Sequence, residues 1–169
     1  IELDVDSTDE DFTVSNATDV TEYMLAGTAA AVADIITLGS STGLTIDNEA
    51  AVGGTAGSST LTLVTPNATS LTVQQGHSSA INAASLTAAK ATSVTVGGNA
   101  TTSAGAAYAG AIRIETLTTA AATEMTIDSN QGARTIDTLT AAKLATLNIV
   151  GDNAVSVGAS GATTSALAT

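Results

Sequence analysis

Apolar residues recur along the chain in a fixed three-point frame. An apolar anchor is followed eight positions later by a second apolar residue and two positions after that by a third, as in Leu86, Val94 and Val96. The same frame fits four other segments: Ile36, Leu44 and Ile46; Leu63, Leu71 and Val73; Leu117, Met125 and Ile127; Leu139, Leu147 and Ile149. Five copies of one frame indicate an internal repeat, which has to be interpreted before any single motif.

The anchors define the length of the repeat. They lie at sequence positions 36, 63, 86, 117 and 139, so the number increases by 27, 23, 31 and 22 from each anchor to the next. A shared basic period accounts for the two shorter steps, and it is about 22–23 residues long, within the range of known repeat architectures. The two longer steps then contain one insertion of four or five residues and another of about nine. We place the longer insertion in the Gly- and Ala-rich stretch Gly97–Gly110.

Each copy is predicted to contain short strands. Residues 71–73 and 94–96 alternate apolar and polar side chains, which is the period of a strand with one buried face. Turn-forming Gly, Asn, Asp or Gln residues follow these strands. A third apolar pulse comes before the next anchor in most copies, at Ile81, Ile112 with Ile114, Ile136, and Val155 with Val157. Two or three short strands in about 22–23 residues match the coil of a parallel β-solenoid.

The predicted fold is therefore all-β, a parallel β-solenoid in which stacking aligns equivalent side chains. The inward column is expected to hold Leu71, Val94, Met125 and Leu147, and the outward polar column Thr45, Thr72, Thr95, Thr126 and Asn148. A β-sandwich is the alternative, and a short helix near Tyr23–Asp34 is the most helix we expect. We expect one solenoid domain over residues 23–169. It is preceded by an acidic segment, residues 1–22, that holds an ion site or connects to a preceding domain.

Composition excludes several function classes. The 169 residues include 34 Ala, 31 Thr and three aromatic residues, and the net charge is −12. Such a chain offers no basic surface to nucleic acid and no apolar run that could insert into a membrane. It has no Cys, and its one histidine, His77, lacks a second His for a zinc site. No Gly-x-Ser-x-Gly motif occurs either, so we expect no enzyme. The start at Ile1 suggests a segment of a larger or processed protein.

Acidic residues form two candidate calcium sites. Residues 1–22 hold eight acids and no base, and the first candidate site in them comprises Asp4, Asp6, Asp9 and Asp11. Calcium takes six to eight oxygen ligands, and alternate carboxylates on an extended chain point the same way. The alternative for this segment is a solvated acidic face. The second candidate set is Asp47, Asp128 and Asp152, which stacking would bring together at turns; the alternative is an Asx turn, in which each side chain bonds its own backbone.

The repeat resembles bacterial surface-layer proteins of the type I-secreted, RTX-related calcium-binding kind, and related giant adhesins. The resemblance spans about residues 25–157 and is carried by residues 144–153 (LATLNIVGDN), residues 70–73 (SLTV) and residues 33–40 (ADIITLGS). No Gly-Gly-x-Gly-x-Asp nonapeptide occurs, so the chain departs from the family's calcium-binding motif. The resemblance implies a calcium-stabilised solenoid, secretion and a structural role.

We therefore expect a structural module of a secreted surface-layer protein, located outside the cell on its surface. It would bind several Ca²⁺ ions and form a rigid, self-assembling lattice. Its partners would be copies of itself in a two-dimensional array and, through other domains, a cell-surface polysaccharide. The alternative is a stalk or spacer module of a large secreted adhesin.

Overall fold

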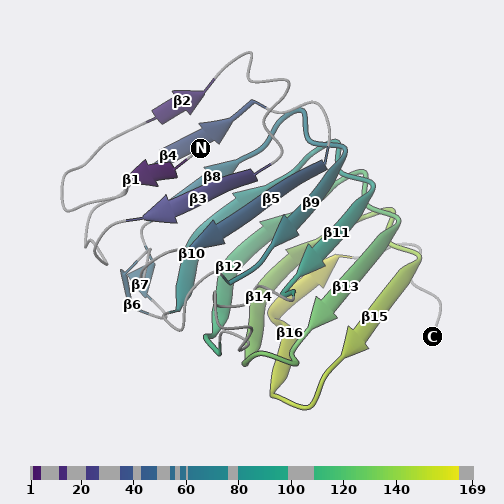
Figure 1. Cartoon of the computed structure of the whole chain (residues 1–169). Helices are drawn as coiled ribbons and strands as arrows, with labels where there is room; N and C mark the ends of the chain where they lie inside the picture. The colour runs from purple at the N-terminus through teal and green to yellow at the C-terminus, as the bar shows by residue number, and fades with distance from the viewer. Residues whose placement is uncertain are drawn as a thin grey trace.

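The computed structural model describes residues 2–4, 12–14, 22–26, 35–39, 43–48, 54–55, 58–59, 61–75, 80–98 and 109–163. These residues form strands, turns and connections, and no helix. Nearly all of the strands belong to two seven-stranded sheets, in which every pairing is parallel (Figure 1). The predicted β-solenoid is confirmed. The β-sandwich alternative is wrong, because sandwiches are built from antiparallel sheets.

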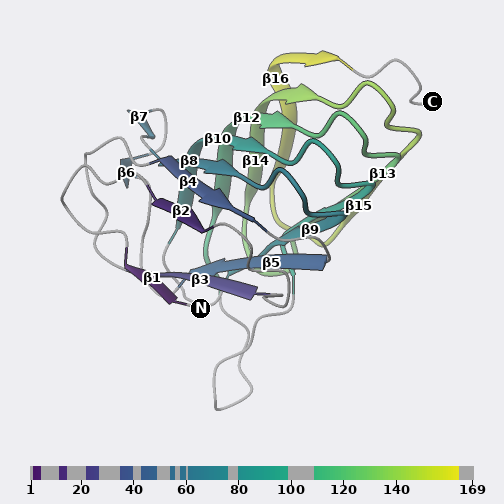
Figure 2. The ribbon, with the colours of Figure 1, turned by 90° about the horizontal axis from the view of Figure 1, so that it is seen from above.

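Successive strands alternate between the two sheets. The first sheet contains β1 (Glu2–Asp4), β3 (Glu22–Ala26), β5 (Gly43–Asn48), β9 (Ser70–Val73), β11 (Ser93–Val96), β13 (Glu124–Asp128) and β15 (Thr146–Val150). The second sheet contains β2 (Phe12–Val14), β4 (Ile35–Leu38), β8 (Leu61–Val64), β10 (Ile81–Thr87), β12 (Ile112–Thr118), β14 (Arg134–Thr140) and β16 (Val155–Thr163). Each coil therefore adds one strand to each sheet, and the sheets lie on opposite sides of the coil (Figure 2).

The strand register confirms the three-point frame. In the second sheet the anchors pair directly from coil to coil: Ile36, Leu63, Leu86, Leu117 and Leu139. In the first sheet the second apolar positions pair likewise: Leu44, Leu71, Val94, Met125 and Leu147. The predicted period thus corresponds to one complete coil, since it brings equivalent residues into lateral contact.

The core lies between the two sheets. Leu71, Val94 and Met125 are buried, as are the anchors from Ile36 to Leu139. Alanine fills the corner that leads from the second sheet to the first, at Ala68, Ala91 and Ala122, with Leu144 at the same place in the next coil. Small aliphatic side chains suffice because each coil buries its apolar face against the neighbouring coils.

The polar column on the first sheet is also confirmed. Direct pairing connects Thr45, Thr72, Thr95, Thr126 and Asn148 in that order. The four threonines are half-buried and Asn148 is exposed, whereas their strand neighbours Leu71, Val94 and Met125 point inward. Thr suits this position because a β-branched side chain packs well on a pleated surface.

The departures from the basic period show where residues are added. Between the anchors Ile36 and Leu63, a small antiparallel pair, β6 (Gly54–Thr55) and β7 (Ser58–Ser59), lies in the chain after β5 and before β8. Between the anchors Leu86 and Leu117, the coil is extended from β11 to β12, and residues 99–108 of the predicted insertion lie outside the described ranges.

The described residues of the first 26 positions form strands of the two sheets. The helix expected near Tyr23–Asp34 is wrong over its described part, because residues 22–26 form β3 and pair with β5. Strands β1 and β2, from the acidic segment, pair with β3 and β4 and so belong to the same two sheets. The division of the chain at residue 22 stays a prediction.

Candidate functional site

The candidate calcium ligands of the first set are placed only in part. Asp4 is the last residue of β1, and Asp47, from the second set, lies in β5. For these two the structure describes the backbone alone. Asp6, Asp9 and Asp11 lie outside the described residues, so an ion site in the acidic segment stays a prediction.

Asp128 closes an Asx turn at the end of β13. Its Oδ1 atom accepts hydrogen bonds from the backbone N–H of Asn130 at 2.9 Å and from the Asn130 side-chain amide at 2.9 Å. This is the local bonding that we named as the alternative to a shared ion site. One carboxylate oxygen of Asp128 is thus engaged by its own turn.

Asp152 lies in the corresponding turn of the next coil, where Asn153 connects the two turns. The side-chain amide of Asn153 donates to the carbonyl oxygen of Ser129 at 2.7 Å and to that of Asn130 at 3.4 Å. It also lies 3.4 Å from Oδ1 of Asp152. Among the residues that the structure describes, no three His, Cys, Asp or Glu side chains are grouped to hold a metal ion. Calcium binding by the turn acids stays a prediction.

The most buried charged group of the described chain is Arg134, which was not among the residues predicted to form a site. Arg134 pairs with Ile112 on one side and Val155 on the other, and Ile112 pairs in turn with Ile81. An arginine therefore occupies a position that is aliphatic in these neighbouring coils. The side chain is only 1 % exposed.

The Arg134 guanidinium binds backbone carbonyl groups. Its Nε donates to the carbonyl oxygen of Asp128 at 2.8 Å, and its Nη1 donates to those of Gly110 at 2.8 Å and Ala133 at 3.1 Å. Nη2 is buried and has no hydrogen-bond partner in the described structure. Burial lowers the pKa of Arg134 and the negative charge of Asp128 partly opposes this shift, yet arginine remains charged near neutral pH.

Glycines and a glutamine complete this corner of the coil. Gly97 has φ of +107°, and a Cβ atom there would lie 2.0 Å from the Asp128 carbonyl oxygen and 2.9 Å from Nε of Arg134. Gln75 is buried; its side-chain amide donates to the carbonyl oxygen of Ala111 at 2.9 Å and accepts from the Gly110 N–H at 3.2 Å. We call Gln75, Gly97, Gly110, Asp128 and Arg134 the arginine corner.

The arginine corner connects turns of successive coils, because the side chains of Arg134 and Gln75 donate hydrogen bonds to backbone carbonyl groups of those turns. A signal for it was present in the sequence. In the third apolar pulse, Ile112 and Ile114 recur as Arg134 and Ile136, so the repeat itself marks Arg134 as a charged residue at an inward position.

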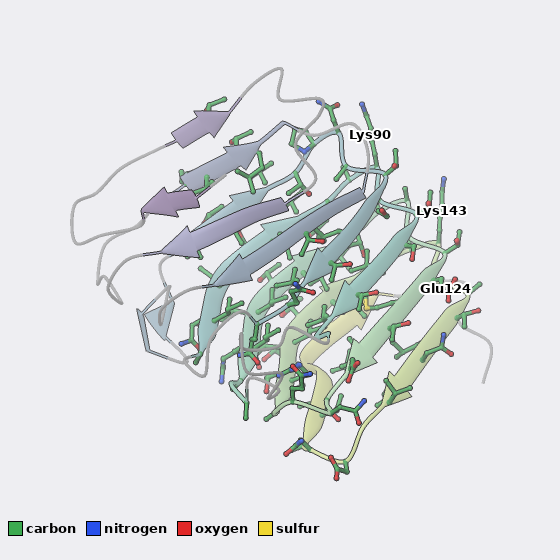
Figure 3. The ribbon with its side chains drawn as sticks, viewed as in Figure 1. Lys90, Glu124 and Lys143 are labelled. Atoms are coloured by element: carbon green, nitrogen blue, oxygen red, sulfur yellow. The ribbon has the colours of Figure 1, made fainter. Side chains whose placement is uncertain are left out.

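Charged side chains of the described coils also form contacts on the outside of the solenoid. Arg113 on β12 forms an ion pair with Asp137 on β14, and both side chains are partly exposed. Lys90 and Lys143 lie along one edge of the solenoid (Figure 3). The Nζ atom of Lys90 donates to the side-chain oxygen of Asn67, one coil away, at 2.9 Å. These are contacts between neighbouring coils.

His77 lies outside the described residues. None of the described segments forms a helix that could cross a membrane. No protein-family model, curated protein or solved structure matches this chain.

Proposed function

We propose that this chain is a structural module of a secreted bacterial surface-layer protein, stabilised by calcium, that acts as a rigid element of a self-assembling lattice on the cell surface. In that setting its partners are copies of itself and, through other domains, a cell-surface polysaccharide. The module has no catalytic role in this proposal.

The observation that carries the proposal is the continuous stacking of coils. Each sheet adds strands in the same direction, and equivalent side chains stay in column from Ile36 to Leu139. A solenoid of this kind is stabilised by contacts between neighbouring repeats along its length. The most buried charged group of the described chain, Arg134, bonds backbone carbonyl groups of successive turns. The polar groups of the interior therefore support a structural role.

Charge supports the calcium part of the proposal. The chain carries 16 acidic and 4 basic residues, and eight of the acids lie within residues 1–22. Uncompensated acids at this density repel one another unless cations neutralise them. Two strands from this acidic segment, β1 and β2, join the same sheets as the rest of the solenoid. Bound calcium would thus stabilise the first coils most.

The second candidate function is a stalk or spacer module of a large secreted adhesin. The same stacking favours it, since a solenoid is also a rigid spacer. The two functions differ in lateral association, because a lattice module assembles with copies of itself and a stalk stays monomeric.

A calcium titration tests the proposal, with circular dichroism melting and light scattering recorded on the same samples. We expect calcium to raise Tm and to increase particle size, because an ion that binds only the folded state stabilises it by mass action. The variant Asp4→Asn with Asp6→Asn should lose much of the rise, while Glu124→Gln, an exposed acid on β13, should keep it. A rise in Tm without particle growth would favour the stalk. No response at millimolar calcium would contradict both calcium binding and the lattice proposal.

A further inference from the structure

The last coil of the described chain leaves its inward side chains partly uncovered. Ile149 on β15 is 54 % exposed, whereas Ile127, its direct partner on β13, is fully buried. Leu147, Val155 and Val157 also pack against the core of the preceding coil, and they are only partly buried. The surface exposed here is thus of the same kind as the contact between any two coils of this solenoid.

The two sheets also end at this coil in the described chain. In the described chain, β15 is the last strand of the first sheet and β16 the last strand of the second. At the opposite end, β1 and β2 are the outermost strands of the same two sheets (Figure 1, Figure 2). Since all pairings within each sheet are parallel, both ends present strands that run in the same direction.

We propose that the β15–β16 end of one molecule binds the β1–β2 end of a second copy of this chain, so that both sheets continue head to tail. This inference rests on the proposed structural function and names the contact by which copies meet along the solenoid axis. An edge strand with unpaired backbone groups is a template for pairing with another chain. When a second copy is displaced along the solenoid axis, its β1 can pair with β15 and its β2 with β16 at the same time.

The register predicts which residues meet. In the second sheet, one column of direct pairs runs through Thr13, Thr37, Val64, Thr87, Thr118, Thr140 and Thr163. Continuation of that column places Thr163 of one molecule beside Thr13 of the next. Such a head-to-tail contact does not close into a ring unless the axis curves, so it yields a linear filament.

Charge determines when this contact forms. The β1–β2 end carries Glu2 and Asp4 and lies within a segment of eight acids and no base. The last described coil carries Lys143 and Asp152, whose opposite charges cancel. Dilute salt leaves the net charge of −12 on each copy unscreened, and the copies repel. We expect association to increase with sodium chloride alone, because salt screens charges that are not in direct contact.

Sedimentation velocity in the presence of a calcium chelator tests the contact without involving calcium. In about 0.5 M sodium chloride, where the screening length is about 4 Å, we expect concentration-dependent oligomers. Ile149→Lys should weaken association at least tenfold, since it places a charge on the uncovered inward position. Thr126→Lys adds the same charge to the outer column of β13 and should leave association unchanged. Circular dichroism of each variant checks that the fold is retained.

Cross-linking then tests the polarity, and the absence of native Cys gives a clean background. Thr13→Cys and Thr163→Cys are prepared as separate proteins and treated with a short bis-maleimide, alone and mixed. Head-to-tail stacking predicts cross-linked dimers in the mixture and none with Thr163→Cys alone. A monomer at every salt concentration, equal association of Ile149→Lys, or dimers of Thr163→Cys alone would each overturn the inference. None of these results depends on calcium, so they are distinct from a failure of the calcium-dependent lattice.

Discussion

Nη1 of Arg134 donates a hydrogen bond of 2.8 Å to the carbonyl oxygen of Gly110, which lies 24 residues earlier in the chain and one coil away. Residues separated by about one repeat length in the sequence are thus in direct contact in the fold. The same guanidinium binds the Asp128 carbonyl oxygen through Nε, so one side chain joins turns from two coils. Arg134 thus places a charged side chain at a position where the neighbouring coils have Ile or Val.

Replacing Arg134 should destabilise the fold. Arg134→Met restores an aliphatic column but leaves the Gly110 and Asp128 carbonyl oxygens without their donors. A buried polar group that loses its partner costs about 1–3 kcal/mol, so we expect the free energy of unfolding to fall by about 2–4 kcal/mol. Urea denaturation measures it. Arg113→Met is the matched control, because its ion pair with Asp137 is partly exposed and should contribute about 0–1 kcal/mol. Equal losses in the two variants would contradict a special role for Arg134.

The effect of Arg134→Met should not depend on pH over the neutral range. Burial lowers the pKa of Arg134 below its ordinary value, so the unfolded state binds more protons than the folded state only in the alkaline window between these two values. In that window, stability rises with pH as the folded-state proton is lost; below it, both states stay protonated. We expect the stability difference between wild type and variant to be the same at about pH 6 and about pH 9. A clear slope between these values would show that another group titrates with Arg134.

Gly97 should be intolerant of a side chain. Its φ of +107° disfavours other residues, and a Cβ atom would clash with the Asp128 carbonyl oxygen. Gly97→Ala should therefore lower the free energy of unfolding by about 3 kcal/mol, since strain and overpacking add. In Gly161→Ala, φ is +150° but nothing lies within 4 Å of the added atom, and we expect a loss of about 1 kcal/mol. Thermal or urea unfolding of both variants decides whether the close contact at residue 97 matters.

Adjacent residues on β9 should respond in opposite ways to the same charge. Leu71 is buried in the inward column and Thr72 is half-buried in the outward column. Leu71→Asp places an unpaired carboxylate in the core and should abolish cooperative folding, as burying a charge without a partner is strongly unfavourable. Thr72→Asp should remain folded with a small change in Tm. Circular dichroism melting compares the two; an unchanged melt of Leu71→Asp would mean that residue 71 does not face a core.

Most of the coil could be predicted from the sequence, because its physical cause is local and repeats. The side-chain alternation at residues 71–73 reflects strand geometry, and the regular recurrence of the three-point frame reflects the length of one coil. The helix expected from residue 23 onward is wrong over residues 22–26, because the pairing of β3 with β5 outweighs the helix propensity of residues such as Met24, Leu25 and Ala26.

The contacts of the candidate site could be predicted less well from the sequence than the coil. Turns that repeat along the stack suggest Asp128 as an ion ligand, but its Oδ1 is bound by Asn130 two positions away. The repeat aligns Arg134 with Ile112, which is a signal for an inward charge, but the sequence does not show what the guanidinium binds. Its partners, the carbonyl oxygens of Gly110 and Asp128, are known only from the folded structure.

The sequence by itself determined the strand pattern, the coil length and the column in which each apolar residue lies, because these follow from periodicities of two residues and of one coil. The tertiary structure alone decided which groups meet at the corners: Arg134 with the carbonyl oxygens of Gly110 and Asp128, and Asn153 with that of Ser129. The contacts with Gly110 and Ser129 span 24 positions each and form only when stacking brings successive turns to hydrogen-bonding distance. The contact with Asp128 closes the connection from β13 to β14 within one coil.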